Sequence, residues 1–185
     1  MATPSDGRNT IEYLLGRGRL ERIDGSTAGD AAARTIGRAT RRLLTADGGL
    51  AAGDVEGAFA AAYDAYRMAA EALLIRQGLR GTGGEGSHVT VEDAISGMFA
   101  KQIPGFAKPT FERLRRTRHT AQYFDPSSAE ISQDDATWAL TISRKVVEAV
   151  EHLLAADPSG RFSQRAAPAP SVSYTHLTLP TNREV

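Results

Sequence analysis

Apolar residues recur every three or four positions along most of the chain, which is the pattern of helices that bury one face. The clearest stripe follows Asp54 and consists of Val55, Phe59, Tyr63, Tyr66, Ala70, Leu73 and Leu74. Asp54 is a good N-cap because its carboxylate can accept hydrogen bonds from the first amides of a helix. We therefore expect a helix over about 54–77, the longest in the chain, ending in the glycine-rich segment 80–87.

Apolar spacing, capping residues, glycines and prolines predict the other helices in the same way. Segments 11–15 and 20–23 are expected to form short helical turns, and a helix over 27–45 should end at the glycines 48 and 49. Thr90 is expected to cap a helix that breaks at Pro104, and Pro109 suits the first turn of an arginine-dense helix. Ser132, with Asp135 three residues on, begins a last helix that runs to Ala156. No strand-like alternation of useful length is present, so the pattern predicts an all-α, mostly antiparallel helical bundle.

The ends of the chain differ from this pattern. We expect a disordered N-terminus over 1–9, the bundle over 10–157 and a linker rich in Pro, Ala and Ser over 158–170. Segment 172–177 back-translates to a DNA sequence that resembles the transposase mosaic end used in sequencing libraries, and segment 177–181 continues into the adapter arm. Residues 171–185 are therefore interpreted as a non-native, adapter-derived tail, which leaves the natural C-terminus beyond about Pro170 open.

Composition narrows the function. Lys+Arg and Asp+Glu both number 22, so any case for nucleic-acid binding must be local. The absence of cysteine excludes disulfides, thiolate catalysis and cysteine-ligated zinc. No apolar run approaches the length of a membrane span and no signal-type segment opens the chain, so a cytoplasmic protein is expected. Cations that are nearly all arginine, with many Ala and Gly, suggest a bacterial genome of high GC content, of actinobacterial type.

The arginine-dense helix carries the main chemical signal. Arg118 follows Phe111 and Leu114 on one helical face, where an apolar residue would be ordinary. A guanidinium at such a position must be paired, lie at a cleft between helices, or contact an anion. Arg115, His119 and Gln122 share a neighbouring face, and the arginine fork matches phosphate geometry. The alternative is a solvated basic face in which Arg118 is held in a salt bridge.

Asp64 is the predicted partner of Arg118 because both charges border apolar stripes. Asp64, Arg67 and Glu71 could instead form a ladder along their own helix. Other candidates are weaker. Glu148 and His152 lack the second copy that a di-iron bundle needs, the glycines of segment 81–86 do not match a phosphate loop, and His88 is interpreted as incidental. No metal and no cofactor are expected.

Two segments together resemble the HEPN domain family of bacterial helical bundles. They are Tyr63–Leu79 in the long helix and Leu114–Tyr123 in the arginine-dense helix, and the resemblance covers about Ile11–Ala156. The family motif is an arginine, often followed by asparagine, then variable residues and a histidine. Arg118 matches the arginine and His119 the polar position, whereas Tyr123 occupies the position of the histidine.

The resemblance implies a domain, expected to be a homodimer, that binds RNA or a partner protein, and whose catalytic form is a metal-independent endoribonuclease of a toxin–antitoxin or defence system. In such enzymes the arginine stabilises charge on the phosphate and the histidine moves a proton. Arg118, His119 and Tyr123 are therefore the candidate catalytic residues, and Asp64, Arg115 and Gln122 the candidate substrate-binding ones. A tyrosine, with a pKa of about 10, is a poor proton shuttle. The alternative is a non-catalytic interaction module that partners a nucleotidyltransferase.

Overall fold

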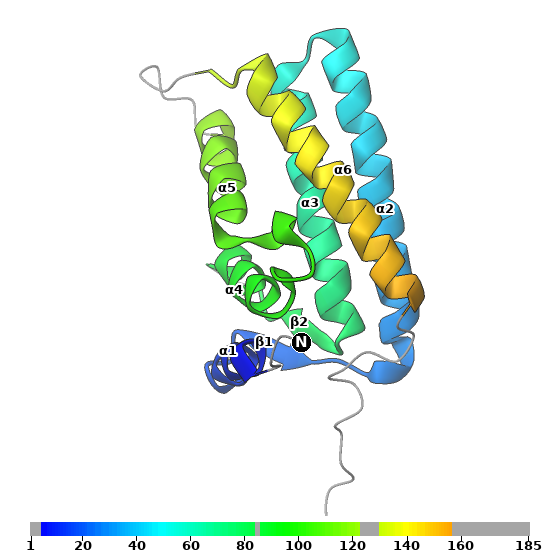
Figure 1. Cartoon of the computed structure of the whole chain (residues 1–185), viewed down its shortest axis with the longest axis vertical. Coiled ribbons are helices and arrows are strands. Elements are labelled where there is room, and N and C mark those ends of the chain that lie inside the picture. Colours follow the sequence, from blue (N-terminus) through cyan, green and yellow to red (C-terminus); the bar gives the residue numbers. More distant parts are fainter. Residues whose placement is uncertain (1–4, 84–85, 123–129, 157–185) are drawn as a thin grey trace, which may run out of the picture.

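Helices account for almost all of the chain in residues 5–83, 86–122 and 130–156, which this computed structural model describes (Figure 1). In chain order the elements are α1 (Ser5–Gly16), β1 (Leu20–Arg22), α2 (Gly25–Ala52), α3 (Val55–Arg76), β2 (Leu79–Gly81), α4 (Ser87–Phe99), the 3₁₀ turn η1 (Pro104–Phe106), α5 (Lys108–Gln122) and α6 (Gln133–Ala156). The predicted all-α bundle is confirmed. No helix within these residues is long and apolar enough to cross a membrane.

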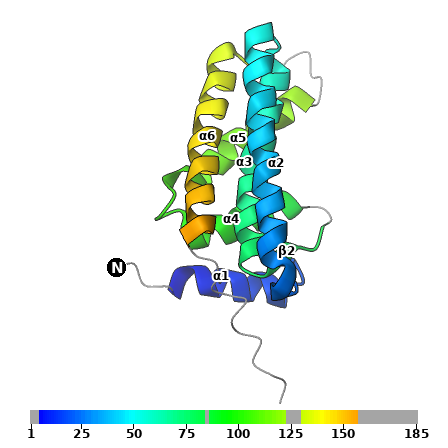
Figure 2. The same cartoon turned by 90° about the vertical axis from the view of Figure 1, so that its right-hand side faces the viewer.

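Helix α3 lies in the middle of the bundle, with α2 and α6 on one side and α4 and α5 on the other (Figure 1). Helix α2 runs antiparallel to α3, whereas α6 runs parallel to it (Figures 1 and 2). Helix α1 lies at the lower end of the molecule, where it packs against α4 (Figure 1). Twelve α3 residues are buried, and many of these are alanines, whose small side chains allow neighbouring helices to approach closely. One result is that the buried Ser143 hydroxyl on α6 donates to the Ala62 carbonyl of α3 at 2.8 Å.

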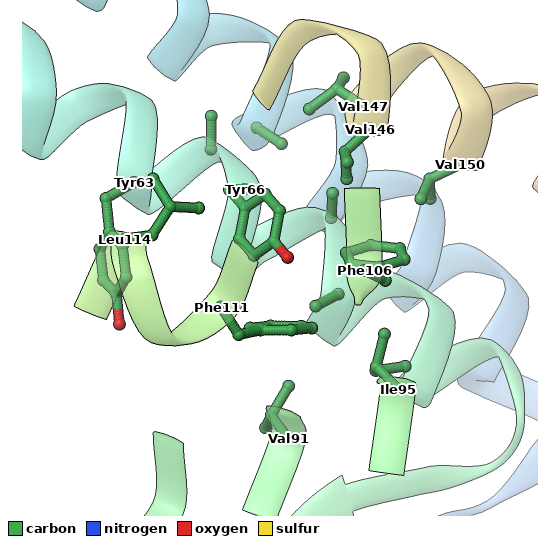
Figure 3. Packing of buried hydrophobic residues seen from close by; sticks show 14 of the residues in the cluster. Tyr63, Tyr66, Val91, Ile95, Phe106, Phe111, Leu114, Val146, Val147 and Val150 are labelled. Carbon is green, nitrogen blue, oxygen red and sulfur yellow. The ribbon is translucent and has the colours of Figure 1, made fainter. Parts of the chain in front are cut away.

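An aromatic cluster fastens α5 and η1 to the other side of α3 (Figure 3). The Tyr66 ring meets the rings of Phe106 and Phe111 edge-on, with centroids 5.5 Å and 4.9 Å away. The Tyr66 hydroxyl donates to the Gly105 carbonyl at 2.7 Å, which satisfies the one polar atom of a ring that is only 1% exposed. This hydrogen bond fixes the turn that leads into α5.

A two-stranded antiparallel sheet closes the lower end of the bundle. Strands β1 and β2 pair Glu21 opposite Arg80, and these side chains form an ion pair at 2.5 Å. The helical turn expected over 20–23 is therefore wrong, since these residues form β1. The strand β2 becomes available because Gly78, at φ 72°, turns the chain out of α3 in the left-handed region that favours glycine.

Several boundaries also differ from those expected. Residues 5–9, expected to be disordered, belong to α1, because Gly7 packs closely against Gly97 and Met98 of α4. Helix α2 continues through the glycines 48 and 49 to Ala52 and is longer than α3. Helix α4 begins at Ser87 with Gly86 as N-cap, so Thr90 lies inside the helix. The caps at Asp54 and Ser132 are confirmed by hydrogen bonds to Gly57 and Asp135.

Gly105 is the position at which an added methyl group should be most damaging to the packing of η1. A Cβ there would lie 2.5 Å from Cγ2 of Val146 on α6. We expect Gly105→Ala to lower the free energy of unfolding by about 1–3 kcal/mol, the usual cost of overpacking. Gly48→Ala is the matched control because nothing lies within 4 Å of its added Cβ, and it should stabilise α2 by about 0.5–1 kcal/mol. Urea denaturation measures both values, and a neutral Gly105→Ala would contradict this packing.

Candidate functional site

Arg118 lies where α5 faces α3, and three groups of α3 hold its guanidinium. Its Nη1 is 3.3 Å from Oδ1 of Asp64 and donates to the Ala60 carbonyl at 3.4 Å. The guanidinium carbon also lies 4.9 Å from the centroid of the Tyr63 ring. Tyr63 lies next to Leu114 of α5 at the edge of the core cluster (Figure 3). The predicted contact between Asp64 and Arg118 is thus confirmed.

Two further arginines lie beside Arg118. Arg67 of α3 has Nε 3.6 Å from the Glu71 carboxylate, and Arg115 of α5 has Nε 3.7 Å from the Glu92 carboxylate of α4. Nε of Arg67 is buried and has no hydrogen-bond partner, so this donor is unsatisfied in the free protein. We call Arg67, Arg115 and Arg118 the arginine cluster.

These pairs are longer than the shortest ion pairs elsewhere in the molecule, such as those of Lys108 with Asp93 and of Arg144 with Asp47. Arg144 on α6 holds both oxygens of Asp47 at 2.8 and 2.9 Å, the short bidentate geometry of a charge-assisted pair. The carboxylates of the arginine cluster lie 3.3–3.7 Å from the nearest guanidinium nitrogen. The cluster therefore has donor capacity that its carboxylates do not fill.

The remaining cations of α5 have partners elsewhere. Lys108 donates to Asp93 at 2.7 Å, Arg113 lies 3.3 Å from Asp135 and stacks on Trp138, and Arg116 pairs with Glu112 one turn away. For these three residues the interpretation as a solvated, paired basic face is correct. Only Arg115 and Arg118 of the described α5 side chains join Arg67.

His88 is the titratable residue that lies against the arginine cluster. It is the second residue of α4, and its Nδ1 is 3.5 Å from Nη1 of Arg67. Burial is the main cause that lowers the pKa of His88, and the positive charges of Arg67, Arg118 and Arg115 lower it further. All three arginines thus influence this imidazole.

Two adjoining depressions open around His88 and Arg67. The larger, of about 280 Å³, lies between α3, β2 and α4. Its polar rim contains Glu71 and Arg80 besides these two residues, and its apolar part is formed by Leu74, Ile75 and Val91. The smaller is a notch of about 10 Å³ that reaches Arg115 and Glu92, enough for about one water molecule. Arg67 and Arg115 therefore border a concave surface, and Arg118 lies beside it against Tyr63, which lines the notch.

Burial disfavours charge on the acidic groups of this region. It raises the pKa of Glu71 and of Glu92, with the neighbouring Arg67 and Arg115 opposing the shift. Burial likewise raises the pKa of the Tyr63 hydroxyl. Tyr63 is thus a neutral platform under Arg118 and has no role as a base near neutral pH.

The structure brings together only part of the predicted site. Asp64, Arg115 and Arg118 lie together, whereas the side chains of His119 and Gln122 and the whole of Tyr123 lie outside the described residues. His88 and Arg67 also belong to the site around Arg118, although the sequence led us to interpret His88 as incidental. The signal that could have found His88 is its place at the start of a helix directly after the glycine-rich loop.

Comparison with protein families identifies the family of the bundle. The model of the HEPN domain matches residues 32–153, which include α3, α4, α5 and nearly all of α6. Comparison with curated proteins and with solved structures found no significant match.

Asp64 should contribute to stability through Arg118. In a double-mutant cycle of Asp64→Asn and Arg118→Gln we expect a coupling free energy of about 0.5–1 kcal/mol, because the pair is partly exposed. Arg113→Gln provides the control, since Arg113 pairs with Asp135 instead. Chemical denaturation measures both cycles, and equal coupling in the two would show that the contact with Arg118 has no specific energetic role.

Proposed function

The chain belongs to the HEPN domain family, and on this basis we propose that it binds the phosphate backbone of RNA at the arginine cluster. The observation that supports the proposal most directly is the gathering of Arg67, Arg115 and Arg118, of which Arg67 and Arg115 line a concave surface and none is held in a short bidentate ion pair. A planar guanidinium with free donors is the side chain best suited to bidentate contact with a phosphate.

The geometry favours a ligand that approaches from the side of α4 and β2. Arg67 and His88 border both depressions, and Arg115 borders the notch. Arg118 is held by Asp64, the Ala60 carbonyl and the Tyr63 ring, which limit its rotamers before a ligand arrives. Such preorganisation lowers the entropic cost of binding.

The chain as a whole is neutral, so affinity must arise locally. Single-stranded RNA is a better ligand than a duplex for a site of this size, because a single strand can bring one phosphate to the concave surface beside the arginines, which a rigid helix would bridge. The apolar residues Leu74, Ile75 and Val91 extend the concave surface away from the arginines.

RNA binding should depend on each arginine of the cluster. We expect Arg67→Gln, Arg115→Gln and Arg118→Gln each to weaken binding of a single-stranded oligoribonucleotide by about tenfold, equivalent to about 1.4 kcal/mol. Each should also reduce the slope of log affinity against log salt by about 0.7, the value for one phosphate contact on a single strand. Fluorescence anisotropy across a salt series measures both quantities.

Arg144→Gln is the matched control because Arg144 is clamped by Asp47 on the other side of α3, and this variant should bind like the original protein. Equal losses in the control would indicate a nonspecific charge effect. No binding at low salt would contradict the proposal and favour the second interpretation, an interaction module for a partner protein such as a nucleotidyltransferase. Light scattering of the same samples tests the predicted homodimer.

Cleavage is tested separately, with RNA in the presence of a metal chelator. We expect the RNA to remain intact, because Tyr123 occupies the histidine position of the family motif and is a poor proton shuttle. Chromatography of the RNA after prolonged incubation measures the outcome. Cleavage that Arg118→Ala abolishes and His119→Ala alters would overturn this expectation and assign a metal-independent endoribonuclease.

A further inference from the structure

The contact between Arg67 and His88 determines the state of the imidazole in the free protein. An arginine can only donate hydrogen bonds, so Nδ1 of His88, 3.5 Å from Nη1 of Arg67, must act as the acceptor. A hydrogen bond in this geometry needs an Nδ1 that carries no proton, so it corresponds to a neutral His88 with its hydrogen on Nε2.

The surroundings of His88 also disfavour a positive charge. His88 lies in the first turn of α4, where the helix dipole is positive. Charged groups face it from every neighbouring element: Arg67 and Glu71 of α3, Arg80 of β2, Glu92 of its own helix, and Arg115 and Arg118 of α5. The charges of Arg67, Arg115 and Arg118 oppose a charge on His88, and burial favours the neutral form of Glu71 and Glu92.

A bound phosphodiester would change both the positive surroundings of His88 and its hydrogen bond with Arg67. Its negative charge offsets the positive potential at the imidazole. The same anion attracts the guanidinium of Arg67, whose Nε lacks a hydrogen-bond partner, and so draws Nη1 away from Nδ1. Nδ1 is then free to accept a proton from solvent and to donate it to a phosphate oxygen.

We propose that His88 is the proton-accepting residue of this phosphate site, neutral in the free protein and protonated when a phosphodiester is bound. The inference rests on the proposed function, since it needs a phosphate at the arginine cluster. It gives the site a second kind of ligand group besides the arginines, drawn from α4 and not from the helix that carries the family motif. It also makes RNA affinity depend on pH near neutrality.

The direction of this dependence follows from linkage. Burial and the three arginines of the cluster hold the pKa of His88 below its ordinary value of 6.5 in the free protein, and a bound anion raises it. Affinity should therefore increase as pH falls from the higher pKa of the complex to the lower pKa of the free protein. Within this window the gain is at most about tenfold per pH unit, the limit for one proton.

The test uses a 2′-O-methyl oligouridylate without a terminal phosphate. This probe cannot be cleaved through a 2′-hydroxyl, and it carries no group that titrates in the range of about pH 5–8 where histidine does. Titration calorimetry of the full chain, in buffers of different ionisation enthalpy, gives the number of protons taken up per oligonucleotide. We expect uptake of up to about one proton in the original protein and none in His88→Gln.

Two matched variants separate His88 from other titratable groups. His152→Gln changes an exposed histidine near the end of α6 and should retain the uptake. His119→Gln tests whether the candidate catalytic histidine of α5 takes up the proton instead. Loss of uptake in His119→Gln, or its persistence in His88→Gln, would assign the proton to His119, Glu71 or Glu92 and overturn the inference. Binding without uptake in the original protein would overturn the inference alone, whereas no binding at any pH would overturn the proposed function with it.

Discussion

The burial of α3 is the constraint on which the rest of the molecule depends. Alanines at 58, 61, 62, 65, 69, 70 and 72 let α2 and α6 pack closely on one side, and the larger side chains Phe59, Tyr66, Leu73 and Leu74 fill the core. A helix covered in this way can carry charge only where its neighbours leave access to water. The charged residues of its middle turns meet this condition, since Arg67 contacts His88 of α4 and Asp64 lies between Arg118 of α5 and Arg42 of α2. The site therefore lies where the packing of α3 permits it.

The aromatic cluster determines how α5 meets this polar strip. Tyr66 binds Gly105 of η1 through its hydroxyl and contacts Phe111 of α5 through its ring. Phe111 and Leu114 are buried on the same face, which places Arg118 one turn further at Asp64. The position of Arg118 on the apolar face of α5 thus follows from the packing of Phe111 and Leu114 against α3. The interface between α3 and α5 therefore contributes both to the stability of the fold and to the geometry of the site.

The sequence was sufficient for the helical fold class and for the contact between Asp64 and Arg118, because both follow from the spacing of residues along helices, although several helix boundaries differed. The stripe on α3 and the line from Phe111 to Arg118 predicted burial and the pairing with Asp64. The strands β1 and β2 could not be predicted, since a three-residue pairing depends on the contact between segments about 60 residues apart. His88 was missed for the same reason, because its role comes from Arg67 on another helix and not from its neighbours in the chain.

The carboxylates beside the arginine cluster bear on how the cluster is held in the free protein and on how a phosphate would bind there. Asp64, Glu71 and Glu92 each lie beside one arginine of the cluster, so every cation of the free cluster has one carboxylate neighbour. A phosphate bound as proposed would compete with these carboxylates for the same donors. The carboxylates lie 3.3–3.7 Å from the nearest guanidinium nitrogen, so an anion that approaches more closely would make the stronger hydrogen bonds. A site of tight bidentate pairs, like that of Arg144 and Asp47, would have no such capacity.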